Sequence, residues 1–177
     1  MADTTITGTG VVTAADYRYV KWVGKTKDNL PIQIVLKRAF CRSNPDWSFA
    51  EKTEAVAQLE FEGVYNDEKL AADDRTEPWE MTGPGATDGK KAIQLGVGKF
   101  YVGASEADAK HHVGLTRGGG SFVVERTFHD INADDDPGSV EGRIWMDESR
   151  PKLKLSALEW VDKVSTLYPS MKTVGEQ

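Results

Sequence analysis

Large apolar side chains alternate with polar ones in the N-terminal half of the chain. In residues 17–23 the run Tyr-Arg-Tyr-Val-Lys-Trp-Val alternates large and charged residues, and residues 31–37 set Ile32, Ile34 and Leu36 against Gln33, Val35 and Lys37. A period of two is the pattern of a strand with one buried face. Turn-forming residues lie between the two segments at 25–29, so we predict a β-hairpin.

A third strand is predicted over residues 56–65. Leu59, Phe61 and Tyr65 share one face, and Gln58, Glu60 and Glu62 share the other. This strand is expected to present carboxylates to water.

The C-terminal half contains four further strand candidates, at residues 93–102, 121–131, 140–146 and 152–155. Gly96 and Gly98 weaken the first and indicate a bulge or a close approach of another group. The glycines at 118–120 are expected to interrupt the chain before the second.

One helix is predicted near the C-terminus. Ser156 and Glu159 have capping-box spacing, apolar residues follow on two adjacent faces, and Pro169 ends the pattern. The helix should run about three turns and pack against a sheet. Ser48 and Glu51 have the same spacing, which leaves a short helical turn open there. The fold class is therefore mainly β.

Residues 81–91 have the most linker-like composition, after an acidic, irregular segment at 67–80. The length of 177 residues fits a single domain.

Composition narrows the classes of function. The net charge of −6 argues against a surface that grips nucleic acid phosphates. Cys41 is the single cysteine, so no internal disulfide can form. The sequence has no apolar run of membrane-spanning length and does not begin like a signal peptide, so we expect a soluble protein made in the cytoplasm.

The best metal candidate is the segment 130–141. Its acidic residues have calcium-loop spacing, but Asp135 stands where the loop needs glycine, and the flanks are strand-like. A solvated hairpin loop is the favoured interpretation. His111 and His112 are adjacent, so on a strand they would point to opposite faces.

The segment that begins at residue 83 partly resembles a phosphate-binding loop. However, Pro84 occupies the place of the first required glycine, and Lys91 occupies the place of the Ser or Thr that would bind magnesium. Cys41 has no histidine nearby in sequence, and His129 is expected to be a satisfied or exposed strand residue. We therefore predict no catalytic residue, no metal and no cofactor, and no enzyme.

Several segments, taken in order, resemble the first half of phage tail tube proteins, the major tail proteins of long-tailed phages. They are Gly-Val-Gly-Lys-Phe-Tyr-Val-Gly at 96–103, Val-Gly-Leu-Thr-Arg-Gly-Gly-Gly-Ser-Phe at 113–122, Asp-Pro-Gly-Ser-Val-Glu-Gly-Arg at 136–143, and Lys-Leu-Lys-Leu at 152–155.

Residues 20–80 resemble the second half of the same family, through the hairpin at 25–29, Ser-Asn-Pro-Asp-Trp-Ser-Phe-Ala-Glu-Lys at 43–52 and Glu-Pro-Trp-Glu at 77–80. The order of the halves is reversed. The resemblance thus implies a circular permutant in which residues 2–82 form the family's second half, residues 83–90 a linker and residues 91–177 its first half, within one domain.

The resemblance implies a β-sandwich with one flanking α-helix, whose inner strands form a β-barrel in a hexameric ring. Rings stack into the tail tube of the virion, which is assembled in the host cytoplasm and conducts DNA without binding it specifically. Tape measure, tail terminator and tail-tip proteins are the implied partners, with no membrane. The candidates for side chains that face the lumen, where negative charge would repel phosphates, are Glu60, Glu62, Glu125 and Glu141.

Two alternatives stay open. A monomeric β-sandwich binding module of a tail tip would display Trp47, Trp79 or Trp145 in a shallow site. A tube protein of a bacterial secretion system would have the same architecture.

Overall fold

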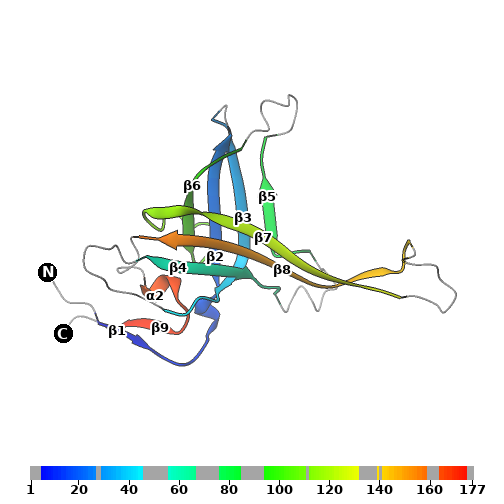
Figure 1. The fold of residues 1–177 in the computed structure, drawn as a ribbon. Helices are drawn as coiled ribbons and strands as arrows, with labels where there is room; N and C mark the ends of the chain where they lie inside the picture. The colour runs from blue at the N-terminus through cyan, green and yellow to red at the C-terminus, as the bar shows by residue number, and fades with distance from the viewer. Residues whose placement is uncertain are drawn as a thin grey trace.

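The computed structural model describes residues 5–26, 29–45, 56–66, 76–84, 94–110, 112–131, 139, 141–158 and 164–174. Their regular structure is mainly antiparallel β, with a curled seven-stranded sheet and a separate two-stranded ribbon (Figure 1). The strands are β1 (Thr5–Gly8), β2 (Arg18–Thr26), β3 (Pro31–Cys41), β4 (Ala57–Gly63), β5 (Trp79–Thr82), β6 (Gln94–Gly103), β7 (Thr116–Asp130), β8 (Ile144–Ala157) and β9 (Met171–Val174).

The main sheet has the order β6-β2-β3-β4-β8-β7, and β5 also pairs with β3. Strand β3 pairs with β5 through residues 33–36 and with β4 through residues 39–41. Strands from both sides of the segment 83–90 are interleaved, since β2 pairs with β6 and β4 pairs with β8. The two halves of the chain therefore share one sheet and one core.

The sheet curls into a half-barrel, so that its two ends face each other across the interior (Figure 1). The rings of Trp79 in β5 and Phe122 in β7 lie 5.4 Å apart across this interior. Near one end of the curl, Val113 N–H donates to the Phe100 carbonyl at 2.8 Å, and Leu158 N–H donates to the Leu115 carbonyl at 2.9 Å. Residues 113–115 therefore link β6 to the end of β8.

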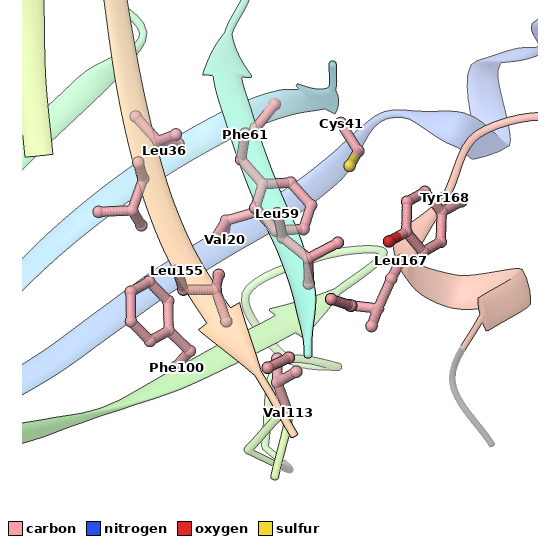
Figure 2. Close-up of a cluster of buried hydrophobic side chains, with 14 of the residues drawn as sticks. Val20, Leu36, Cys41, Leu59, Phe61, Phe100, Val113, Leu155, Leu167 and Tyr168 are labelled. Atoms are coloured by element: carbon pink, nitrogen blue, oxygen red, sulfur yellow. The ribbon is translucent and has the colours of Figure 1, made fainter. Parts of the chain in front are cut away.

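Apolar side chains from the inner face of the sheet meet in the core (Figure 2). In β4, Leu59 and Phe61 are buried while Gln58, Glu60 and Glu62, which alternate with them, are exposed or partly exposed, as the alternation predicts. Leu167 and Tyr168, in and after the short helix α2 (Val164–Leu167), cover one side of this core. Burying each large apolar side chain contributes about 1.5–3 kcal/mol, so the curl is stabilised by the face that it encloses.

Trp22 lies across two glycines that sit opposite each other, Gly24 in β2 and Gly98 in β6. A Cβ atom on either glycine would overlap the indole ring. The β2–β6 register also shifts between Gly24 and Lys25. Both the close approach and the bulge expected around Gly98 are therefore present.

The predicted hairpin and the strands at 17–23, 31–37, 56–65 and 93–102 correspond to β2, β3, β4 and β6. The interruption predicted at residues 118–120 is wrong, because these glycines belong to β7. Gly119 has φ +80° and the register shifts between Thr116 and Gly120, so the irregularity is absorbed as a bulge within the strand. The separate strands predicted at 140–146 and 152–155 are instead joined in one strand, β8, which runs through the buried Pro151.

The helix does not begin at Ser156, which belongs to β8 and donates a hydrogen bond from its hydroxyl to Gln58 at 2.8 Å. Among the described residues α2 covers only Val164–Leu167. The predicted positions at 159–163, the helical turn at 48–51 and the acidic residues 67–75 lie outside the described residues. Strands β1, β5 and β9 were not predicted, because four residues are too few to show a period.

The two described ends of the chain pair with each other in the ribbon of β1 and β9, where Thr5 lies opposite Val174. The residues that flank the segment 83–90 also lie close in the sheet. Thr82 is opposite Gln33 and Gln94 is opposite Thr26, both near the turn between β2 and β3. A short connection across that turn therefore suffices to join β5 to β6.

We predict that Gly98→Ala destabilises the fold by about 1–3 kcal/mol, because the added methyl displaces the Trp22 indole from its packed position. Urea unfolding measures the change in free energy. Gly83→Ala is the matched control, since a Cβ there meets its nearest atom, on Ile32, at an ordinary 3.8 Å. Equal stability of the two variants would contradict the proposed packing.

Candidate functional site

Three of the four carboxylates predicted to line a lumen lie on one face of the sheet. Glu60 is opposite Lys154, and Glu62 is opposite Lys152, across the β4–β8 pair. Glu125 is opposite Arg150 across the β7–β8 pair. This outer face is turned away from the core because Leu59, Phe61 and Leu153, which alternate with these residues, are buried.

Each carboxylate on this face forms an ion pair with a basic side chain. Lys154 Nζ lies 2.7 Å from Glu60, and Lys152 Nζ lies 2.7 Å from Glu125 and 3.7 Å from Glu60. Arg42, directly after β3, donates two guanidinium hydrogen bonds of 3.2 Å to Glu62 in a separate pair. We call the six residues Arg42, Glu60, Glu62, Glu125, Lys152 and Lys154 the charged belt.

The pairing shifts the titration of its members. The hydrogen bond from Lys152 lowers the pKa of Glu125, and the same bond raises the pKa of the Lys152 ammonium. Both side chains therefore stay charged at neutral pH.

The charged belt carries three carboxylates and three basic groups, so it has no net formal charge. The sequence of β4 alone predicted an acidic face. In the structure the lysines of β8 neutralise this charge, and the alternation within β4 could not predict that β8 would be its neighbour. Glu141 does not belong to the belt. It lies in an exposed turn before β8, at the far end of the β7–β8 hairpin.

The β7–β8 hairpin extends away from the rest of the sheet (Figure 1). Its last residues next to the body are Arg126 and Ser149, which lie opposite each other, and Ser149 is buried. Beyond them every described residue is exposed. We call residues 127–131 and 141–148 the arm.

The arm exposes five large apolar side chains. Phe128 and Trp145 are each 55% exposed, and Ile131, Ile144 and Met146 are 44–52% exposed. A hairpin of two strands is at best marginally stable alone in water, and such a concentration of exposed apolar groups indicates a contact surface. The sequence pattern predicted the alternation of β7. It did not predict that β7 and β8 extend beyond the part of the molecule that covers them.

Where the arm begins, β7 is held to the body by Glu77, which precedes β5. Its carboxylate accepts two hydrogen bonds of 2.9 Å from the Arg126 guanidinium and one from the Trp79 indole. The adjacent Pro78 is buried, and its carbonyl accepts a hydrogen bond from Lys37 N–H at 3.1 Å. Glu77 and Arg126 therefore clamp β7 to the β3–β5 side of the sheet where the arm begins.

Burial alone would raise the pKa of Glu77, but hydrogen bonds from Arg126 and Trp79 outweigh it and lower the pKa below its ordinary value of 4.5. The clamp is therefore charged at neutral pH and is weakened only in acid.

Two clefts lie beside the hairpin. A cleft of about 340 Å³ opens between the two ends of the curled sheet and is lined mainly by apolar side chains. A broader one of about 1050 Å³ lies at the base of the arm and includes belt residues. The apolar residues that line the smaller cleft are Trp22, Ile34, Met81, Phe100, Phe122 and Leu153.

The candidates for chemistry stay separate in the structure. Burial raises the pKa of the Cys41 thiol to about 11, so the thiol is protonated and is a poor nucleophile. His129 is exposed and contacts Asp147 at 2.5 Å, and His112 forms an isolated bridge with Tyr101. His111 lies outside the described residues.

Of the calcium-loop segment, residues 132–138 and 140 are outside the described part of the chain, and Asp130 accepts a hydrogen bond from Ser139. Among the residues that the structure describes, no group of three or more His, Cys, Asp or Glu side chains is placed to hold a metal ion. No helix in the same residues is long and apolar enough to cross a membrane.

The chain matches no protein-family model, no curated protein and no solved structure.

We predict that Glu77→Gln lowers the free energy of unfolding by about 1.5–3 kcal/mol at neutral pH, because charged hydrogen bonds to Arg126 are lost. The pKa of Glu77 is depressed in the folded state, so this contribution is present above 4.5 and disappears as the pH falls through the folded-state value. Urea titrations at about pH 7 and about pH 3 measure both effects.

Glu148→Gln is the control, since Glu148 is about half exposed and pairs with Arg150. Its effect should be under about 1 kcal/mol. A difference between Glu77→Gln and the wild-type protein that does not change with pH would contradict the clamp.

Proposed function

We propose that the chain is a structural subunit that assembles with copies of itself into a phage-type tail tube, as the resemblance to tail tube proteins implies. The observation that carries the proposal is the arm, a two-stranded projection with five exposed apolar side chains. Such a surface is costly to leave in water and is stabilised when another chain covers it.

The outer edge of β7 supports the same proposal. Strands β6 and β7 are the outermost strands of the sheet. The edge of β6 is partly covered by the bridge between Tyr101 and His112. Strand β7 is 15 residues long, and such an edge offers backbone groups to a strand of a neighbouring copy. In the proposed assembly, six copies close a ring in this way and the rings stack into a tube.

The charged belt fits a wall along which DNA slides. Its lysines are already paired with carboxylates, so they attract phosphates weakly, and the neighbouring carboxylates repel them. We propose Glu60, Glu62 and Glu125 as lumen-facing groups within this neutral, mixed-charge surface. Glu141, at the end of the arm, is proposed to lie between rings rather than in their wall.

The closeness of the chain ends supports the proposed circular permutation. Thr5 pairs with the strand that ends at Val174, and the end of β5 and the start of β6 both lie near the turn between β2 and β3. Permutation is tolerated when the natural ends lie together at the surface. The facing halves of the curled sheet, packed around Trp79 and Phe122, are the proposed counterpart of the family's β-sandwich.

Electron microscopy of the purified protein tests the proposal, with hollow rings or tubes as the expected result. Trp145→Ser should lower the assembled fraction measured by sedimentation at least about tenfold, because it removes an exposed aromatic contact from the arm. Val11→Ser is the matched control, since Val11 is 61% exposed outside the arm, and it should assemble like the wild-type protein.

A protein that stays a single chain at every concentration contradicts the proposal. That result would favour the binding module, in which the exposed Trp145 beside His129 and Asp147 serves as a recognition surface.

A further inference from the structure

We propose that each arm inserts between two other copies of the chain, with one of its faces seated in the apolar cleft of the first copy and the other covered by the second. This inference rests on the proposed self-assembly and adds the surfaces that meet.

The two faces of the arm differ in chemistry. Residues directly opposite each other on antiparallel strands share a face, and successive residues alternate. Phe128 is opposite Met146, which shares its face with Ile144. Asp130, opposite Ile144, also lies on this first face and accepts a hydrogen bond from Ser139, so the face is apolar except at its outer end.

The second face combines an aromatic ring with a contact between a histidine and an aspartate. His129 is opposite Trp145 and lies 2.5 Å from Asp147, so these three side chains share the second face. Trp145 is 55% exposed there. Because large apolar groups project from both faces, a partner that covers one face leaves the apolar side chains of the other face exposed to water. Two covering surfaces are therefore needed.

The chain itself carries a surface that suits the first face. The cleft of about 340 Å³ between the ends of the curled sheet is lined by Trp22, Met81 and Phe122 among others, and Met81 is 47% exposed at its mouth. Phe128, Ile144 and Met146 are the same kind of side chain as those that line the cleft. A copy of this chain is therefore a partner that supplies the required apolar surface.

No copy can fill its own cleft. Phe122, which lines the cleft, and Phe128, on the arm, lie on the same strand and six residues apart. At roughly 3.4 Å per residue they are about 20 Å apart along a strand that points away from the cleft. The cleft is therefore open to the arm of another copy.

The contact joins two different surfaces, an arm and a cleft, so each copy can give one and receive one. Such heterologous contacts propagate into rings or filaments rather than stopping at a dimer. On the second face the Asp147 carboxylate already contacts the His129 ring, so this face does not favour a phosphate-rich partner such as nucleic acid.

Photo-crosslinking tests the two-sided insertion. A benzophenone amino acid replaces Met146 on the first face or Trp145 on the second, and the adducts are mapped by mass spectrometry. We expect the probe at 146 to capture peptides around Met81 and Phe122 of another copy, and the probe at 145 to capture a different surface. A chain with both probes should give an adduct of three chains. The same probe at Val12, which is 52% exposed outside the arm, should give none.

A second variant tests the cleft without changing the arm. Met81→Arg places a charge at the exposed mouth of the cleft and should lower the assembled fraction at least about tenfold. The Val11→Ser control should leave assembly unchanged.

The outcomes separate the two proposals. Capture of the same peptides from 145 and 146, or adducts of two chains only, overturns the two-sided insertion while leaving self-assembly in place. Rings or tubes that form normally with Met81→Arg and give no adduct from the arm also overturn it alone. A single chain that never forms an adduct overturns both.

Discussion

The apolar face of one antiparallel sheet has to be covered, and the described part of the chain has little besides the sheet with which to cover it. Among the described residues the helical cover is the single turn at Val164–Leu167. The sheet therefore curls until β5 and β6 face β7, and its inner side chains bury one another around Phe61. The glycines under Trp22 and at the β7 bulge give the strands the close approach and the bend that this curl requires.

The same constraint explains why the arm stands out. The curl covers β7 and β8 only as far as the pair of Arg126 and Ser149, where Glu77 fastens β7 to the body. Beyond that point the strands continue without an inner layer, and their apolar side chains are exposed on both faces. The sheet buries its own core but leaves its longest hairpin uncovered. In the proposed assembly, other copies of the chain cover that hairpin.

Much of the strand content could be predicted from the sequence, because Leu59 and Phe61 or Ile32 and Leu36 record which face of each strand is buried. The alternation within a strand could not predict which other strand would pair with it. The sequence around Glu60 and Glu62 predicts an acidic surface. In the sheet, however, Lys154 and Lys152 lie opposite these two residues, although they are nearly a hundred positions away in the sequence. The capping pattern at Ser156 was overridden by the pairing of β8 with β4, and the glycines at 118–120 were read as a break because a bulge and a break have the same composition.

The account depends on the edge of β7 being joined to another copy. Hydrogen–deuterium exchange compares that edge in assembled and unassembled protein, both isolated by size-exclusion chromatography. We predict that the backbone amides of residues 121–130 that point to the free edge of β7, away from β8, exchange at least about tenfold more slowly in the assembled fraction, while the core amides of β4 change little. Equal exchange of residues 121–130 in the two fractions would contradict the account, because it would show that copies associate without using this strand.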